Sequence, residues 1–171
     1  MNDETTQILN QLATGNRVEM WEAAKAITDR HESVMVPALL NLLRAGEATE
    51  RRVAAAWALG FLRSPAALEL LIEILRNKSE PHALRDQAAE SLGYLADRRA
   101  REALVENLSD ANGDVVFSCA FALRTVGTKA DIPHLEGLTH NLSLVNYYGA
   151  SIAEEAGEAI EQIKTRYDQK T

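Results

Sequence analysis

The chain repeats itself with a period of 31 to 33 residues, and this period constrains the fold more than any other feature of the sequence. The segment "RRVAAAWALGFL" (51–62) returns as "LRDQAAESLGYL" (84–95), with an Arg, the Ala-Ala pair and the Leu-Gly in register. A forward shift of 31 and a backward shift of 32 extend the pattern in both directions. Periods of about 20 to 50 residues indicate stacked supersecondary units rather than one layered core.

Each copy contains two apolar runs at helical spacing, separated by a short polar break. The first run is rich in Ala, and the second carries Leu or another apolar residue at i, i+1 and i+4. Pro37, Pro65 and Pro133 fall near the starts of second runs, where a missing N–H costs least. Asn16 followed by Glu19 has the spacing of a capping box. Since no stretch alternates between apolar and polar residues, we expect an all-α chain of about ten helices.

We expect a single domain over residues 1–171. Residues 1–15 would form an N-terminal half repeat that caps the stack, and residues 16–140 would form four helix pairs. A helix over residues 145–168, which includes Gly149, would close the other end with a polar outer face.

The pattern R-x-x-A-A-x-x-L-G-x-L, then a turn, then A-x-x-x-L-L-x-x-L, resembles the HEAT-like repeats of bacteria and archaea, often called PBS-lyase HEAT-like repeats. Residues 52–75 and 85–108 match best, and the resemblance covers roughly residues 17–140. It implies a right-handed α-solenoid of antiparallel helix pairs, with first helices on the convex side and second helices on the concave side. The flanking copies depart from the pattern at the glycine, where they have Thr28 and Arg124, and at the arginine, where they have Met20 and Val116.

Arg52 and Arg85 occupy the arginine position of this pattern. We interpret them as structural residues that bond the turn of a neighbouring repeat, because buried polar groups in a stack must find partners and backbone carbonyls are the nearest. A role in ligand binding is the alternative.

The overall composition narrows the classes of partner. With 25 acidic and 18 basic residues the net charge is −7, which disfavours a protein that must neutralise phosphates. No apolar run approaches the ~18 residues of a membrane span, and the early acidic residues do not resemble a secretory signal. The lone Cys119 suits a reducing compartment. We therefore expect a cytoplasmic protein that binds neither nucleic acid nor membrane.

Several proteins of similar architecture are enzymes, and their chemistry requires residues that can be looked for in this sequence. Deoxyhypusine hydroxylase resembles this family and holds a di-iron centre through repeated His-Glu pairs. Here His31-Glu32 has no counterpart in later repeats, so we interpret it as a solvated turn. His134 and His140 point in different directions on a helix, and Cys119 takes a core-facing position without a nearby His.

Two further architectures of this kind bind DNA or bilins. Alkylpurine DNA glycosylases need a cationic groove, and the second helices here are mixed to acidic. Phycobilin lyases share the repeat type, but no residue of this chain marks a bilin pocket. We therefore expect no catalytic residue, no metal and no cofactor.

The outward positions of the first helices carry an unusual number of aromatic residues. Each first helix has three outward positions. In the copy that starts at Arg52 all three carry apolar residues, whereas each sister copy has at least one polar side chain among its three. A helix that is apolar all round must be covered by something, and an exposed patch of this kind usually marks an interface with a partner or a second copy. The alternative is that the rings lean into grooves between repeats. This convex patch consists of Ala54, Trp57, Phe61, Tyr94 and Phe121.

The second helices offer a strip on the concave side that combines carboxylates with apolar residues. Such a strip could take a basic protein surface, and an ordinary solvated face is the alternative. This concave strip consists of Arg44, Leu70, Glu73, Ile74, Arg76 and Glu106.

The sequence therefore favours a non-enzymatic module that binds a protein partner as an adaptor, a scaffold or an inhibitor of the immunity type. The alternative is an enzyme-accessory protein, similar to the phycobilin lyases, that acts on a chromophore or a modified residue.

Overall fold

The computed structural model describes residues 3–14, 16–30, 33–45, 48–140 and 145–168. Within these residues the regular structure is helical, apart from one isolated bridge between Val145 and Ser151. The α-helices are α1 (Asp3–Thr14), α2 (Arg17–Asp29), α3 (Val36–Arg44), α4 (Thr49–Phe61), α5 (Leu68–Arg76), α6 (His82–Leu95), α7 (Arg101–Glu106), α8 (Gly113–Val126), α9 (Ile132–Thr139) and α10 (Ile152–Asp168).

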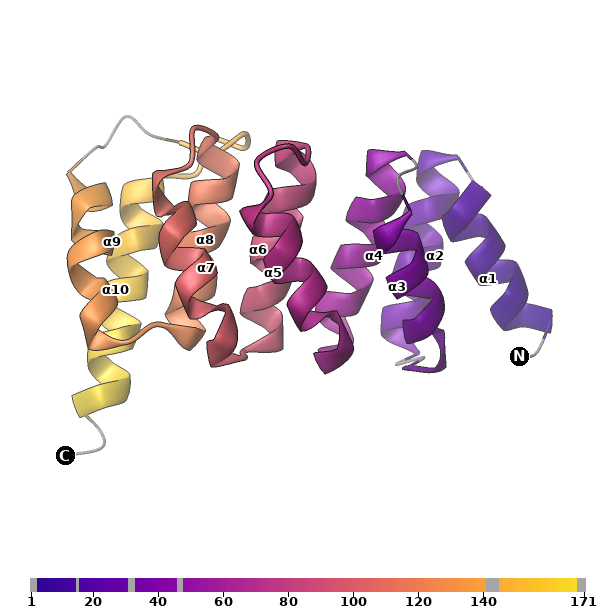
Figure 1. The fold of residues 1–171 in the computed structure, drawn as a ribbon, viewed down its shortest axis with the longest axis horizontal. Helices are drawn as coiled ribbons and strands as arrows, with labels where there is room; N and C mark the ends of the chain where they lie inside the picture. Colours follow the sequence, from indigo (N-terminus) through magenta and orange to yellow (C-terminus); the bar gives the residue numbers. More distant parts are fainter. Residues whose placement is uncertain (1–2, 15, 31–32, 46–47, 141–144, 169–171) are drawn as a thin grey trace.

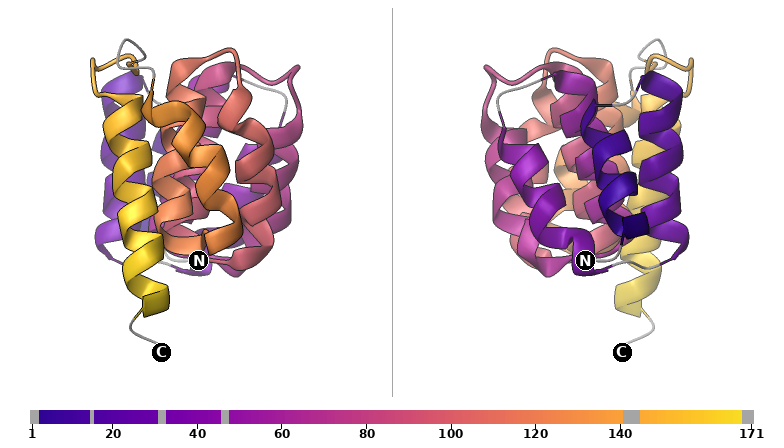
Figure 2. Two further views of the ribbon diagram at one scale, coloured as in Figure 1. Left: turned by 90° about the vertical axis from the view of Figure 1, so that its left-hand side faces the viewer. Right: turned by 90° about the vertical axis from the view of Figure 1, so that its right-hand side faces the viewer.

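The helix pairs follow one another in chain order, from α1 at one end to α9 and α10 at the other (Figure 1). Views along the stack show α10 at one end and α1 at the other (Figure 2). Each first helix packs on the next: α4 packs on α6, and α6 packs on α8. Helix α10 packs on α8 as the next member of that series. The predicted all-α solenoid is confirmed. No helix in the described ranges has the length and apolar character needed to cross a membrane.

Helix starts follow the local signals in the sequence. Asn16 caps α2: its side-chain oxygen accepts hydrogen bonds from the backbone N–H groups of Val18 and Glu19 at 2.9 and 3.1 Å. Glu19 in turn accepts the N–H of Asn16 at 2.9 Å, which completes the predicted capping box. Prolines occupy the first turns of α3 and α9, and of the 3-10 turn Pro65–Ala67 before α5, as predicted.

The last helix begins later than the sequence indicates. Residues 145–151 form a tight turn instead of the first part of α10, because the Asn146 side chain accepts the N–H groups of Tyr148 and Ala150 at 3.0 and 2.9 Å. Gly149 has φ +80°, a left-handed conformation that no helix interior contains. The prediction of a helix from residue 145 is therefore wrong at its start.

Small residues set the distance between neighbouring first helices. A Cβ added to Gly60 would lie only 2.8 Å from the Cβ and 2.9 Å from the Cα of Ser91, so α4 and α6 are almost in backbone contact. A Cβ added to Gly93 of α6 would likewise lie only 3.0 Å from the Cα of Ala122 in α8. The Ser91 hydroxyl donates to the carbonyl of Ala56 at 2.9 Å, so the polar atom in this seam is satisfied.

Arg52 links three segments of the stack. Its Nε donates to the carbonyl of Leu43 at the end of α3 at 2.9 Å. Its two terminal nitrogens form a bidentate pair with Glu80, before α6, at 2.6 and 2.7 Å. The same side chain therefore connects its own repeat to the turns before and after it.

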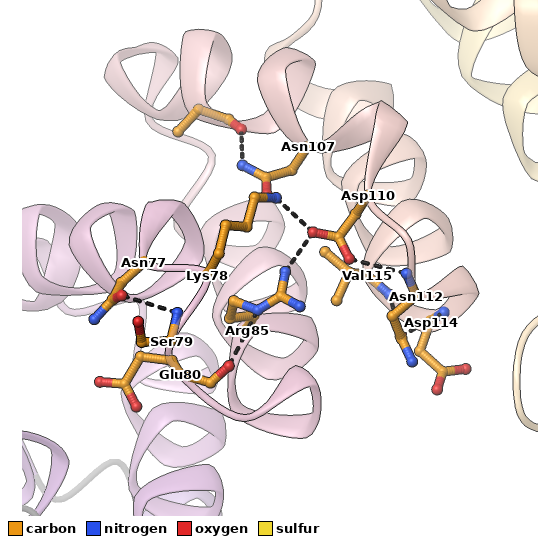
Figure 3. Close-up of polar contacts among 11 residues, drawn as sticks. Asn77, Lys78, Ser79, Glu80, Arg85, Asn107, Asp110, Asn112, Asp114 and Val115 are labelled. Atoms are coloured by element: carbon orange, nitrogen blue, oxygen red, sulfur yellow. Dashed lines mark hydrogen bonds and ion pairs between the residues drawn. The ribbon is translucent and has the colours of Figure 1, made fainter.

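Arg85 makes the equivalent connection one repeat later (Figure 3). It donates to the backbone carbonyl of Glu80 at 3.3 Å and to the carboxylate of Asp110, which also binds Lys78. Asp110 accepts the N–H of Asn112 at 2.9 Å as well. Burial raises the pKa of Asp110, but the hydrogen bonds from Arg85 and Lys78 outweigh this effect and lower it to about 2.

The seam between α4 and α6 can be tested with a pair of glycine substitutions. Gly60→Ala forces a methyl group against the backbone of Ser91, and we expect it to lower the free energy of unfolding by about 1–3 kcal/mol. Gly157→Ala in α10 is the matched control, because, apart from its chain neighbours and the nearby backbone of its own helix, no described atom lies within 4 Å of its added Cβ. There the gain in helix propensity should raise the free energy of unfolding by about 0.5–1 kcal/mol. Urea unfolding followed by circular dichroism measures both, and equal effects would contradict the close approach.

The role of Arg85 and Asp110 as a link between repeats predicts a pH-dependent stability. Asp110→Asn removes the charge that Arg85 and Lys78 share, and we expect a loss of about 3 kcal/mol in the free energy of unfolding at neutral pH. The folded pKa of about 2 lies below the ordinary value of 3.8, so the ionised carboxylate stabilises the fold above about pH 4. This contribution disappears as the pH falls from about 4 to about 2, where parent and variant should converge.

Urea unfolding at several pH values measures this convergence. Glu136→Gln on α9 removes an exposed carboxylate and serves as the control, which should stay close to the parent throughout. A gap between the parent and Asp110→Asn that is independent of pH would contradict the assignment of this ion pair.

Candidate functional site

Aromatic rings form a continuous row across four first helices. Trp21 of α2 meets Trp57 of α4 with ring centroids 5.7 Å apart, and Trp57 lies 4.5 Å from Phe61 on the same helix. Phe61 contacts Tyr94 of α6 at 4.7 Å, and Tyr94 contacts Phe121 of α8 at 5.8 Å. These separations are those at which aromatic pairs attract one another. The row therefore brings together four residues of the predicted patch and adds a fifth ring, Trp21.

The patch is only partly open to solvent. Phe61 is 45% exposed, whereas Trp57, Tyr94 and Phe121 are half-buried between neighbouring helices. The prediction that Ala54 faces outward is wrong, since its side chain is fully buried. Gln87 and Ser118 occupy the same position in later repeats and are 8% exposed each. The first helices approach so closely that this position faces the adjacent helix rather than solvent.

Trp21 is missing from the predicted patch because the sequence pattern places Glu22, Lys25 and Asp29 on the outward face of the first repeat. Trp21 stands one position before that face, in register with Val53 of the next repeat. A ring of this size beside the contact between α2 and α4 can reach over the neighbouring helix. The aromatic residues on α4 are the sequence signal that could have identified Trp21 as part of the row.

Two hollows flank Trp57. One, of about 590 Å³, is lined by Lys25, Thr28, Asp29, Trp57 and Phe61. The other, of about 490 Å³, runs over α2, α4 and α6 and combines aromatic and acidic side chains; we name it the acidic-aromatic groove. Its described lining consists of Trp21, Thr49, Glu50, Val53, Trp57, Ala83, Asp86, Gln87, Glu90 and Tyr148.

Asp86 and Glu90 give the groove its electrostatic character. Burial raises the pKa of Asp86 to about 6, although the Ser118 hydroxyl donates to it at 2.6 Å, and the carboxylates of Asp114 and Glu90 add to the rise. Glu90 accepts hydrogen bonds from Gln87 at 2.7 Å and from the Tyr94 hydroxyl at 3.0 Å. Burial and the neighbouring Glu90 raise the pKa of Tyr94 to about 12, so its hydroxyl remains a donor at neutral pH.

The predicted strip on the second helices is more self-contained. Arg76 pairs with Glu106 at 2.7 Å and with Glu102 at 3.4 Å, so charges on α5 and α7 neutralise one another. Arg44 and Glu73 are exposed and Leu70 is half-buried around a small hollow of about 260 Å³.

Ile74 corrects one expectation about this strip. It is only 2% exposed, because it lies three residues after the buried Leu71 and so shares the core-facing side of α5. The strip therefore offers less apolar surface than the sequence indicates.

Among the described residues, the side chains with chemical reactivity are not gathered into one centre. No group of three or more His, Cys, Asp or Glu side chains in the described part of the chain could hold a metal ion. Cys119 is buried, and desolvation raises the pKa of its thiol. His134 and His140 are exposed at the ends of α9. His31 and Glu32 lie outside the described residues.

Two curated proteins are similar to part of the chain. Phycocyanobilin lyase subunit alpha of Microchaete diplosiphon is 36% identical over 94 residues, which are 51% of this chain and 31% of that protein. Deoxyhypusine hydroxylase of Drosophila pseudoobscura pseudoobscura is 32% identical over 71 residues, 42% of this chain and 24% of that protein. The chain thus matches less than a third of the length of either relative.

Solved structures share the fold over nearly the whole chain. One is the complex of CpcE and CpcF of phycocyanin lyase from Nostoc sp. PCC7120, with a TM-score of 0.74, 18% identity, and coverage of 91% of this chain and 96% of that one. An engineered protein gives a TM-score of 0.65 at 20% identity, covering 95% of this chain and 80% of its own. The sequence pattern of HEAT repeats matches residues 5–83 and 71–144, and the chain belongs to the HEAT repeat family.

Proposed function

We propose that this chain is an accessory subunit that binds a second protein and assists an enzyme acting on a chromophore or a modified side chain. The observation that carries the proposal is the row of aromatic rings along the first helices. Tyr and Trp side chains of this kind are typical anchors of protein interfaces. The row runs from α2 to α8, so one partner surface could contact several repeats at once.

The similarities support the accessory form of this function. A curated relative is named a lyase subunit, and a solved structure with the same fold is a complex of two lyase polypeptides. These relatives favour an accessory role over a free-standing adaptor, scaffold or inhibitor, which the sequence alone favours.

The geometry suits binding better than bond-making. The repeats are joined by tight seams and by ion pairs such as Arg52 with Glu80, so the surface is rigid and loses little entropy when a partner docks. The lone thiol is buried inside α8, away from any approaching substrate. We place the chemical step on the partner or on the assembled pair.

Phe61→Glu tests the aromatic row as the interface. Phe61 is the most exposed ring of the row, so a carboxylate there should leave the fold intact while opposing apolar contact. Affinity purification of the tagged chain from its native cell should recover one protein in about equimolar amount, and the variant should lose about tenfold or more of it, as removal of an interface anchor does.

Val34→Glu is the matched control, because Val34 is an exposed apolar residue before α3, outside the row. It adds the same charge and should retain the partner. Recovery that is equal with parent, Phe61→Glu and Val34→Glu would reject the row as the interface. Loss of a self-associated species in sedimentation would show that the partner is a second copy.

The chromophore part of the proposal is tested separately. We expect the visible absorbance band of phycocyanobilin to shift when it is mixed with the chain and its recovered partner, because a bound bilin exchanges water for protein contacts. Gel filtration then shows whether pigment and protein travel together. An unchanged spectrum without co-migration would reject the chromophore and leave protein binding intact.

A further inference from the structure

We infer that the acidic-aromatic groove binds a lysine or arginine side chain that a protein partner presents. The inference rests on the proposed function only in requiring a protein to supply the cation. Three arrangements within the groove point to this occupant: its aromatic walls, its carboxylates and the turn that forms one lip.

The walls are aromatic on two sides. Trp21 and Trp57 both line the groove, and their rings meet edge to face with an interplanar angle of 83°. Tyr148 lines the same groove from the turn before α10. A cation that lies over the face of a Trp or Tyr ring is attracted by the negative face of the ring, and the attraction grows where water is partly excluded.

The charges in the groove have one sign. Glu50, Asp86 and Glu90 line it, and none of its described lining residues is Lys or Arg. One Asp86 oxygen accepts from Ser118, and no hydrogen bond to its other oxygen is seen among the described residues. The neighbouring hollow beyond Trp57 contains Lys25 with Asp29, so its charge is balanced. Charge complementarity therefore selects this groove, rather than its neighbour, for a cation.

The lip of the groove is held in place by backbone geometry. Tyr148 is 89% exposed, and its backbone N–H donates a hydrogen bond to the side chain of Asn146 at 3.0 Å. The Asp114 carboxylate accepts the N–H of Tyr147 at 2.5 Å and so ties the turn to α8. An exposed ring on an anchored turn can close over a bound side chain without a large rearrangement of the backbone.

The groove contains its own reporter, because Trp21 and Trp57 are the only two tryptophans of the chain. The probe is a synthetic peptide of alternating glycine and lysine. The control is the same peptide with every lysine acetylated. Titration with the lysine peptide should change the tryptophan fluorescence in a saturable manner, and added salt should weaken the binding. The acetylated peptide should produce no saturable change.

Two pairs of charge-matched variants locate the binding. Glu50→Gln with Glu90→Gln should weaken the affinity for the lysine peptide about tenfold. Glu136→Gln with Glu161→Gln removes the same charge from exposed positions on α9 and α10 and should leave the affinity unchanged. Tyr148→Ala, at an exposed position, should weaken binding about threefold through the lost cation–π contact.

Three results would overturn the inference. They are the absence of a saturable change with the lysine peptide, equal binding of the acetylated peptide, and equal weakening by the two double variants. The last would assign the attraction to net charge alone. If the lysine peptide does not bind while Phe61→Glu still releases the native partner, the cation site is rejected and the proposed function stands. If the peptide binds while Phe61→Glu does not affect recovery of a partner, the proposed function alone is rejected.

Discussion

The close approach of neighbouring first helices determines which side chains this fold can bury and which it must expose. Gly60 against Ser91, and Gly93 against Ala122, bring successive helix backbones nearly into contact. At that distance a first helix is covered by its neighbours on both sides as well as by its own second helix. Only a narrow outer stripe remains, and any large side chain in the stripe extends over the adjacent repeat. The aromatic row is a consequence of this spacing, because rings too large for the seams lie across them and touch each other.

Much of the fold can be predicted because its signals are local or repeated. The period of the sequence, the prolines at helix starts and the capping box of Asn16 with Glu19 each act within a few residues of where they occur. The predicted start of α10 is wrong because Asn146 and Gly149 form a turn whose hydrogen bonds outweigh the helical pattern after it.

The candidate site is harder to predict, because exposure depends on the neighbouring repeat. Ala54 has the correct spacing for the outer face, yet the distance to the adjacent helix buries it. Tyr148 reaches the groove from a turn that lies far along the chain from Glu90, the nearest in sequence of the other lining residues. No periodicity could place it there. Trp21 escapes the same reasoning, since its contact with Trp57 crosses from one repeat to the next.

The joints between repeats are not equal. Arg52 and Arg85 connect their repeats to neighbouring turns by ion pairs, whereas the same position in the first repeat is the buried Met20. In a linear stack each repeat depends on its neighbours, so opening starts at the joint with the least holding it. The joint between the first and second repeats lacks the ion pair that an arginine at position 20 would make; the hydrogen bond from Arg52 to the Leu43 carbonyl and the contact of Trp21 with Trp57 hold it. A ligand bound in the groove against both rings would hold the first repeat onto the rest, so its affinity and the order of the N-terminal end would be thermodynamically linked.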